Sequence, residues 1–209
     1  MNLARRVVRA VPLSLALLAA GCSSLFSVQR TPFTIYSPRY TAAAHAGPRV
    51  DWQLAVETPI ASDALDSSRL LAMPSPGVLE VFPNARWRDS APVLLRSLVV
   101  EGFDRSGRIV GVGSTASGLR ADYALAIVLR DFQLEVAGGS PRAAIRFQAQ
   151  LLDYTSSRVL ASRSFDETAP AAGTDAASAF AAFETGLNAV IPELVDWTLA
   201  EGEARHRAK

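Results

Sequence analysis

The sequence predicts an α/β domain of the α+β type, with a mainly antiparallel sheet and two principal helices packed on one of its faces. Three observations support this fold class. Stretches of alternating apolar and polar residues recur along the chain, separated by Pro- and Gly-rich turns. Residues 122–168 contain three such stretches in succession, which predicts a three-stranded meander. Two other segments carry apolar residues at intervals of three and four, as amphipathic helices do.

Elements in the first part of the domain are predicted from short apolar runs and from the residues that interrupt them. Pro lacks a backbone donor and Gly favours turn conformations, so both mark the ends of strands. The predicted segments are a strand at residues 31–36, a loop at 37–50, a strand at 50–57, and strands at 69–73 and 78–82 around Pro74-Ser75-Pro76-Gly77. The last two strands therefore form a predicted strand–turn–strand unit.

The first helix is expected to begin after Asp89 or Ser90, either of which can cap it. Pro92 is tolerated in the first turn of a helix. Apolar residues then recur every three or four positions, and Gly107 predicts the end of the helix. A strand is expected next, at residues 109–112.

The second helix is expected to begin at Thr174 or Asp175. Its apolar residues recur at intervals of three and four in a narrow seam, formed by Phe180, Phe183, Leu187, Val190, Leu194 and Trp197. Packing on the sheet explains this seam, and a coiled-coil contact with a partner is the alternative. Pro192 lies inside the helix and is expected to kink it near Asn188.

The N-terminal segment has the architecture of a bacterial lipoprotein signal peptide. Arg5, Arg6 and Arg9 precede an uncharged run rich in Leu and Ala, and small residues then lead to Cys22, the only cysteine. The run is too short for a spanning helix, which needs about 20 apolar residues. We therefore predict a signal peptide at residues 1–21 and lipid attachment at the thiol of Cys22. The alternative is an ordinary signal peptide, cut elsewhere, with an incidental cysteine.

Lipid attachment would determine where the protein resides. Two or more acyl chains anchor a protein stably, at about 0.8 kcal/mol per buried methylene. Ser23 follows Cys22 in place of Asp, which resembles an outer-membrane sorting signal, so we expect the periplasmic face of the outer membrane. Residues 22–30 are then a lipidated tether, residues 31–200 one domain, and residues 201–209 a basic C-terminal tail, solvated and frayed.

Charge and motifs argue against nucleic-acid binding and catalysis. Without the signal peptide, 18 basic residues face 20 acidic ones, a net charge of −2 that gives no polybasic footprint. His45 and His206, the two histidines, have no nucleophile or carboxylate at motif spacing, and we expect no metal or cofactor. Asp122, Asp131 and Asp153 flank predicted strands, and they would carry the chemistry of an envelope hydrolase, the least favoured function.

An aromatic residue between two arginines precedes the first predicted helix. Trp87 can pack as a staple at the helix start and leave Arg86 and Arg88 solvated. The three can also form an exposed contact, because Trp and Arg are enriched in binding hot spots. Both interpretations stay open, so Arg86, Trp87 and Arg88 are candidate partner-contact residues.

Several segments together resemble the ABC-type transport auxiliary lipoproteins, whose members include the paraquat-inducible protein C group. The ordered set covers most of residues 31–200 and follows the expected lipid-attachment sequence at Cys22. The matching segments are Ala85-Arg86-Trp87, Gly118-Leu119-Arg120-Ala121-Asp122-Tyr123, Leu129-Arg130-Asp131-Phe132-Gln133, Ala149-Gln150-Leu151-Leu152-Asp153, Val159-Leu160-Ala161-Ser162-Arg163-Ser164-Phe165 and Val195-Asp196-Trp197.

The resemblance implies a non-enzymatic accessory subunit. Its expected partners are an MCE-domain protein, an ABC permease and an ATPase, which together move lipids or other hydrophobic molecules across the envelope. The resemblance leaves room for a homo-oligomeric ring and supplies no catalytic residues; Cys22 is the one position that matches a functional site. An alternative of a different class is a periplasmic shuttle that carries an acyl chain in a cleft between sheet and helices, which the apolar helix faces motivate.

Overall fold

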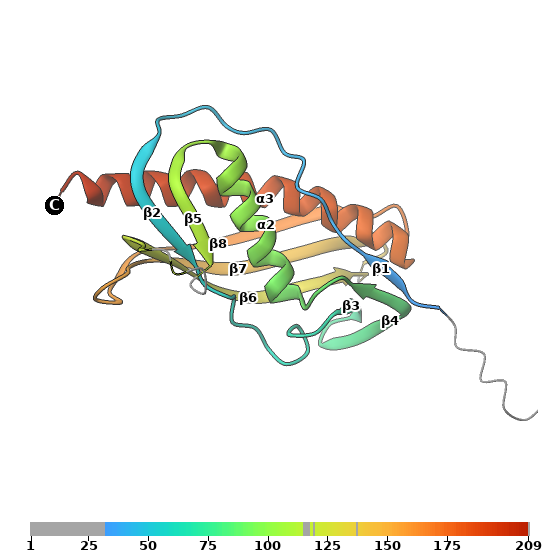
Figure 1. The fold of residues 1–209 in the computed structure, drawn as a ribbon. Coiled ribbons are helices and arrows are strands. Elements are labelled where there is room, and N and C mark those ends of the chain that lie inside the picture. The colour runs from blue at the N-terminus through green and yellow to red at the C-terminus, as the bar shows by residue number, and fades with distance from the viewer. Residues whose placement is uncertain (1–31, 115–117, 119, 137, 209) are drawn as a thin grey trace, which may run out of the picture. The chain divides into compact units, whose positions relative to one another are not determined.

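A computed structural model describes residues 32–114, 118, 120–136 and 138–208. The chain divides into two compact units, and the second, Phe33–Lys209, contains every described helix and strand. In chain order these elements, shown in Figure 1, are β1 (Thr34–Tyr36), β2 (Val50–Val56), β3 (Arg69–Ser75), β4 (Val78–Trp87), α2 (Ala91–Ser106), β5 (Ile109–Ser114), β6 (Tyr123–Glu135), β7 (Arg142–Asp153), β8 (Val159–Pro170) and α3 (Ala176–His206).

Eight strands form one sheet around β6 (Figure 1). On one side of β6, β7 and β8 follow in sequence order as antiparallel neighbours. On its other side β6 runs parallel to β2 over its first residues and parallel to β3 over its last, so two groups of strands share this edge. The first group continues from β2 to β5, and the second from β3 to β4 and then to β1.

The sheet is mixed, which corrects the prediction of a mainly antiparallel sheet. Four of the seven pairings between described strands are parallel, namely β1–β4, β2–β5, β2–β6 and β3–β6. The sequence shows which segments alternate but not which neighbours they choose, and the parallel partners lie far apart in the chain: Leu54 of β2 lies opposite Tyr123 of β6. The coarser prediction, an α+β domain with two principal helices, is confirmed.

The β3–β4 hairpin has the predicted antiparallel pairing around a turn at Pro76 and Gly77. Gly77 has a φ of 79°, a left-handed conformation that glycine adopts without steric cost. β4 continues further than predicted, to Trp87, and Asn84 within it also has a positive φ of 57°. This longer β4 brings Arg86 and Trp87 into the sheet instead of leaving them in a loop.

The two helices begin and end close to the predicted residues. α2 follows the N-cap Ser90 and ends at Gly107, whose φ of 63° closes the last turn. Asp175 caps α3, and its carboxylate accepts the N–H groups of Ala177 and Ser178 at 3.0 Å each. The helices pack against each other and against the sheet, so they cover its apolar face.

The sheet has an apolar inner face and a more polar outer face. In β7, Ile145 and Phe147 are buried, whereas Arg146, on the opposite face, is half-buried. A register shift in β6 between Leu129 and Asp131 marks a β-bulge. The apolar side chains of β6 beyond this bulge therefore remain on the buried face.

The C-terminal residues belong to α3, which corrects the prediction of a frayed tail. α3 continues through Pro192 as far as His206. Arg205 donates to the carbonyl of Leu160 in β8 at 2.9 Å, and Gly202 lies against the indole ring of Trp52. Basic residues in this segment favour solvent exposure, but the small Gly202 lets the packed face of the helix continue beyond residue 200.

Candidate functional site

The predicted lipid-attachment residue, Cys22, lies outside the described residues, and the candidate site lies in the part of the chain that follows it. The first element after the predicted tether is β1, and residues 37–49, which we call the strap, then connect β1 to β2 (Figure 1). The strap contains no helix or strand, in keeping with its Pro, Ala and Gly content. It therefore links the first strand of the domain to the second.

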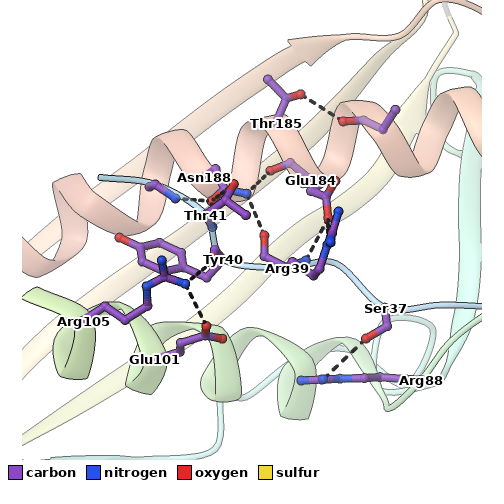
Figure 2. Close-up of polar contacts among 12 residues, drawn as sticks. Ser37, Arg39, Tyr40, Thr41, Arg88, Glu101, Arg105, Glu184, Thr185 and Asn188 are labelled. Atoms are coloured by element: carbon purple, nitrogen blue, oxygen red, sulfur yellow. Dashed lines mark hydrogen bonds and ion pairs between the residues drawn. The ribbon is translucent and has the colours of Figure 1, made fainter. Parts of the chain in front are cut away.

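The strap lies between α2 and α3, and Asn188 of α3 binds it much as a neighbouring strand would (Figure 2). The Oδ1 of Asn188 accepts the N–H groups of Thr41 at 2.6 Å and Ala42 at 2.8 Å, and its Nδ2 donates to the carbonyl of Arg39 at 2.9 Å. The N–H of Arg39 donates to Glu184 at 2.9 Å. One side-chain amide thus satisfies backbone donors and an acceptor together.

Tyr40 is one of two buried residues of the strap, together with Pro38. Its side chain is 5% exposed and lies near Gly102 of α2. Arg105 of α2 donates to the Tyr40 carbonyl at 2.6 Å, and its guanidinium lies 5.6 Å from the ring centre (Figure 2). Burial raises the pKa of the Tyr40 hydroxyl, and the charge of Arg105 partly opposes this rise. The strap consequently contributes a side chain to the hydrophobic core.

Asp196 of α3 forms a second attachment point for the strap. The Nδ1 of His45 lies 2.5 Å from one of its oxygens, and Arg108 pairs with the other. Arg108 also donates to the carbonyl of Pro48 at 3.5 Å. Burial acts to raise the pKa of Asp196, but the hydrogen bonds from His45 and Arg108 outweigh it and lower the pKa. The carboxylate is therefore charged and holds the C-terminal part of the strap close to α3, directly at His45 and through Arg108 at Pro48.

Sequence reasoning missed this cluster because its members are far apart in the chain. His45 and Asp196 are separated by 151 residues, so neither lies at a recognisable motif spacing from the other. A signal that could have found them is the pairing of a histidine in a Pro-rich loop with an aspartate on the apolar side of a helix. Such a pairing becomes visible once the loop is known to cross the helix.

The carboxylates considered for a hydrolase occupy separate structural positions. Asp122 accepts the N–H of Gln53 at 2.9 Å, and Asp153 accepts the N–H of Ser156 at 2.9 Å. Asp131 accepts from a glutamine side chain two residues away, at 2.8 Å. Within the described residues no group of three or more His, Cys, Asp or Glu is arranged to hold a metal ion. Each of these carboxylates thus has a local structural role.

The three candidate contact residues divide into one core residue and two exposed ones. Trp87 is 2% exposed, and this burial corrects the idea that its ring is available to a partner. The ring packs against the rings of Phe132, Phe180 and Phe183, with centroid distances of 5.5, 6.4 and 5.2 Å. Arg86 and Arg88 are exposed: the guanidinium of Arg86 lies 4.1 Å from the ring centre of Phe33, and Arg88 pairs with Asp89 at 3.3 Å.

The space between the strap and the helices is too small for an acyl chain. The hollow lined by Tyr40, His45 and Pro192 has a volume of about 10 Å³, roughly that of one water molecule. Two larger hollows, of about 390 and 370 Å³, lie elsewhere, one lined by Arg158 and Arg205 and one by residues of the β3–β4 hairpin. None of these three hollows supports a shuttle that carries a lipid between the sheet and the helices.

The fold of this chain is also found in solved proteins. A crystal structure of a protein from Xanthomonas campestris is 40% identical to this chain, covers 83% of it and 99% of its own length, and superposes with a TM-score of 0.79. A crystal structure of an uncharacterized protein, 15% identical, covers 79% of this chain and 98% of its own, with a TM-score of 0.63, and shows the shared fold alone.

The class of this protein is shown by a family model and not by the fold alone. The model of the ABC-type transport auxiliary lipoprotein component family matches residues 33–195, and the chain belongs to that family. An uncharacterized protein from Bradyrhizobium diazoefficiens is 29% identical over 149 residues, which are 70% of this chain. The chain spans 39% of the length of that relative.

Proposed function

We propose that this chain is a lipid-anchored periplasmic accessory subunit of an MCE-type ABC transport system. In this role it resides at the periplasmic face of the outer membrane, attached through Cys22. It docks an MCE-domain protein, and through it a permease and an ATPase, which together move lipids or other hydrophobic molecules across the envelope. The observation that carries the proposal is the match of residues 33–195 to the auxiliary lipoprotein family.

The N-terminal sequence supports the anchor. Three arginines, an uncharged run and small residues precede Cys22, as in lipoprotein signal peptides. The helices in the described part of the chain include none that is long and apolar enough to cross a bilayer. Membrane attachment through acyl chains on Cys22 is consistent with both observations.

The strap is consistent with a docking role. It follows β1, which already pairs with β4 in the sheet, and Asn188 and Asp196 bind it to α3. α3 in turn packs on β7 and β8. The chain is thus attached to both the sheet and the helix layer from its first strand onward, as a folded adaptor requires.

Recovery of partners from membranes tests the proposal. A C-terminally tagged chain is expressed in its own host, solubilised in mild detergent and captured, and we expect an MCE-domain protein with its permease and ATPase among the recovered proteins. Metabolic labelling with palmitate should mark the wild-type chain and leave Cys22→Ser unmarked.

The Cys22→Ser variant is the matched control, because it removes the predicted lipid and leaves residues 32–208 unchanged. We expect it to leave the membrane fraction and to recover markedly less permease. Recovery of none of the three subunits, while a known envelope complex survives the same detergent, would contradict the docking role. Equal sedimentation of both chains with the envelope would contradict the anchor.

A further inference from the structure

A row of exposed side chains crosses the edge of the sheet where the chain enters the domain. Ile35 of β1 lies directly opposite Arg86 of β4, and Arg86 lies directly opposite Arg69 of β3. Side chains paired in this way point to the same face of a sheet. All three are exposed, and the adjacent pair of Tyr36 and Trp87 points inward to the core. The row therefore belongs to the outer face.

The two arginines of this row have no acidic partner within the part of the chain that the structure describes. Among the described residues no carboxylate lies within ion-pair distance of Arg69 or Arg86, and like charges directly opposite each other in a sheet are destabilising. Other arginines of the outer face do have acidic partners; Arg146, for example, pairs with Glu135 and Asp166 at 2.6 and 2.8 Å. An uncompensated pair of guanidinium groups is suited to an external anion.

Apolar side chains accompany these charges. Phe33 is 54% exposed with Arg86 over its ring, and Ile35 is 67% exposed. Three further exposed apolar residues of β4, namely Val78, Leu79 and Val81, lie toward the turn of the β3–β4 hairpin, away from Arg86. Exposed apolar groups beside basic ones are the features of a membrane-surface contact.

The position of this row in the chain identifies the occupant. Phe33 is eleven residues from Cys22, and a chain of that length spans at most about 36–40 Å when fully extended. This reach is shorter than α3, whose 31 residues are about 46 Å long. In an anchored protein this short tether therefore keeps the edge that carries Phe33 and Ile35 near the bilayer.

We propose that Phe33, Ile35, Arg69 and Arg86 form a lipid-contact surface that rests on the bilayer holding the anchor. The two guanidinium groups bind phosphates of anionic phospholipids, and Phe33 and Ile35 enter the headgroup region. This proposal rests on the proposed lipid anchor. It adds an orientation: the outer face at the β1–β4–β3 edge turns to the lipid, and the β5 edge of the sheet, with the helix layer, is available to other proteins.

A fluorescent label placed on this surface tests the orientation. Because Cys22 is the only cysteine and is acylated in the proposal, Ile35→Cys supplies one reactive thiol. The acylated variant is labelled with an environment-sensitive dye and reconstituted into vesicles of phosphatidylethanolamine and phosphatidylglycerol that contain a spin-labelled lipid. We expect a blue shift and quenching of the dye, both weakened by salt.

Val110→Cys is the matched control, because Val110 is 52% exposed on β5, at the opposite end of the strand order from β1. We expect several-fold weaker quenching there. Combining Ile35→Cys with Arg69→Gln and Arg86→Gln should reduce quenching several-fold. Combining Ile35→Cys instead with Arg49→Gln and Arg130→Gln, at exposed arginines outside the surface, should leave the quenching unchanged.

The outcomes separate this proposal from the anchor on which it rests. If mass spectrometry shows acylation and the dyes at positions 35 and 110 are quenched alike, or not at all, the orientation is wrong and the anchor stands. A blue shift at position 35 without lipid quenching indicates cover by a second copy or another protein and overturns the proposal. If Cys22 is not acylated, the proposed anchor is wrong. In that case the unlabelled chain is mixed with the same vesicles, and if it does not cosediment with them in a salt-sensitive way, the lipid-contact surface is wrong as well.

Discussion

Helix α3 contacts the sheet on one side and the strap on another, and different interactions hold the two contacts. Toward the sheet, Phe183 packs in an aromatic cluster, with its ring centre 4.7 Å from that of Phe132 and 5.2 Å from that of Trp87. Toward the strap, Asn188 and Asp196 make hydrogen bonds to groups that are largely exposed or half-buried.

The two contacts differ in what their loss costs. Truncating a large buried aromatic side chain costs about 3–5 kcal/mol, whereas a single hydrogen bond contributes a net of about 0.5–1.5 kcal/mol. Regions held by few buried apolar contacts also open locally before the whole domain unfolds. Within the strap only Pro38 and Tyr40 are buried, so we expect residues 41–49 to detach while the sheet and helices stay folded.

The largest effect is expected from the sheet side, at Trp87. Trp87→Ala should lower the free energy of unfolding by about 3–5 kcal/mol, because it leaves a cavity among three phenylalanine rings. Urea denaturation followed by circular dichroism measures this change. Arg86→Ala, one residue away but exposed, should change it by less than about 1 kcal/mol. Similar losses in both variants would show that the contrast between buried and exposed positions in β4 is wrong.

A smaller effect on the same side is expected at Gly202. A Cβ there would meet the ring of Trp52, with Cη2 at 2.8 Å and Cε2 at 3.0 Å, and overpacking costs about 1–3 kcal/mol. Ala favours a helix over Gly by about 1 kcal/mol, so Gly202→Ala should give a net loss of up to about 2 kcal/mol. At Gly186 the nearest atom is the flexible end of Ile145, at 3.0 Å, so Gly186→Ala should be close to neutral. A stabilising Gly202→Ala would contradict the tight helix–sheet contact.

On the strap side, Asn188→Ala should act locally. It removes three hydrogen bonds to backbone groups of residues 39–42, and we expect a global loss of only about 1–2 kcal/mol. Hydrogen exchange of residues 37–49 should accelerate several-fold while exchange in β6 and β7 is unchanged. Thr185→Ala, an exposed residue of the same helix, is the control. Faster exchange throughout the sheet would mean that the strap cannot open independently.

Local elements of the fold were predictable from the sequence, because each depends on neighbouring residues. Asp175 and Gly107 mark helix ends, and Gly77 marks the hairpin turn. The parallel pairings were not predictable, since alternation in β2 does not tell that β6 and β5 lie on its two sides. The alternation of apolar and polar residues along a strand indicates which face is buried, but the neighbouring strands depend on the packing of the whole domain.

The candidate site shows the same limit. The pattern around Cys22 involves adjacent residues, so the sequence alone predicts a lipid-attachment site there. Asn188 and Asp196, by contrast, are recognisable as strap contacts only when the strap is seen to cross α3. Trp87 illustrates the opposite error. The arginines on either side of it suggest a contact surface. As the last residue of β4, however, Trp87 points its ring inward, and of the three residues only Arg86 and Arg88 are exposed.

The smallest effect is a dependence of strap opening on pH, through Asp196. A carboxyl group whose pKa is lower in the folded state binds fewer protons there than in the unfolded chain. Its stabilising contribution is therefore complete above the unfolded value of about 3.9 and is lost as the pH falls through the lower folded pKa. His45, Arg108 and Tyr40 face this carboxylate, and protonating it leaves Arg108 without its acidic partner.

We accordingly expect hydrogen exchange of residues 43–49, divided by the intrinsic exchange rate at each pH, to rise as the pH falls below the unfolded carboxyl pKa of about 3.9. In Asp196→Asn this ratio should already be high at neutral pH and should depend less on pH than in the wild type. Glu193→Gln is the control: Glu193 lies on the same helix and makes an exposed ion pair with Arg163 of β8, and this variant should behave as wild type. An unchanged pH profile in Asp196→Asn would place the acid sensitivity of the strap elsewhere, because the strap would then be held independently of the charge that His45 and Arg108 share.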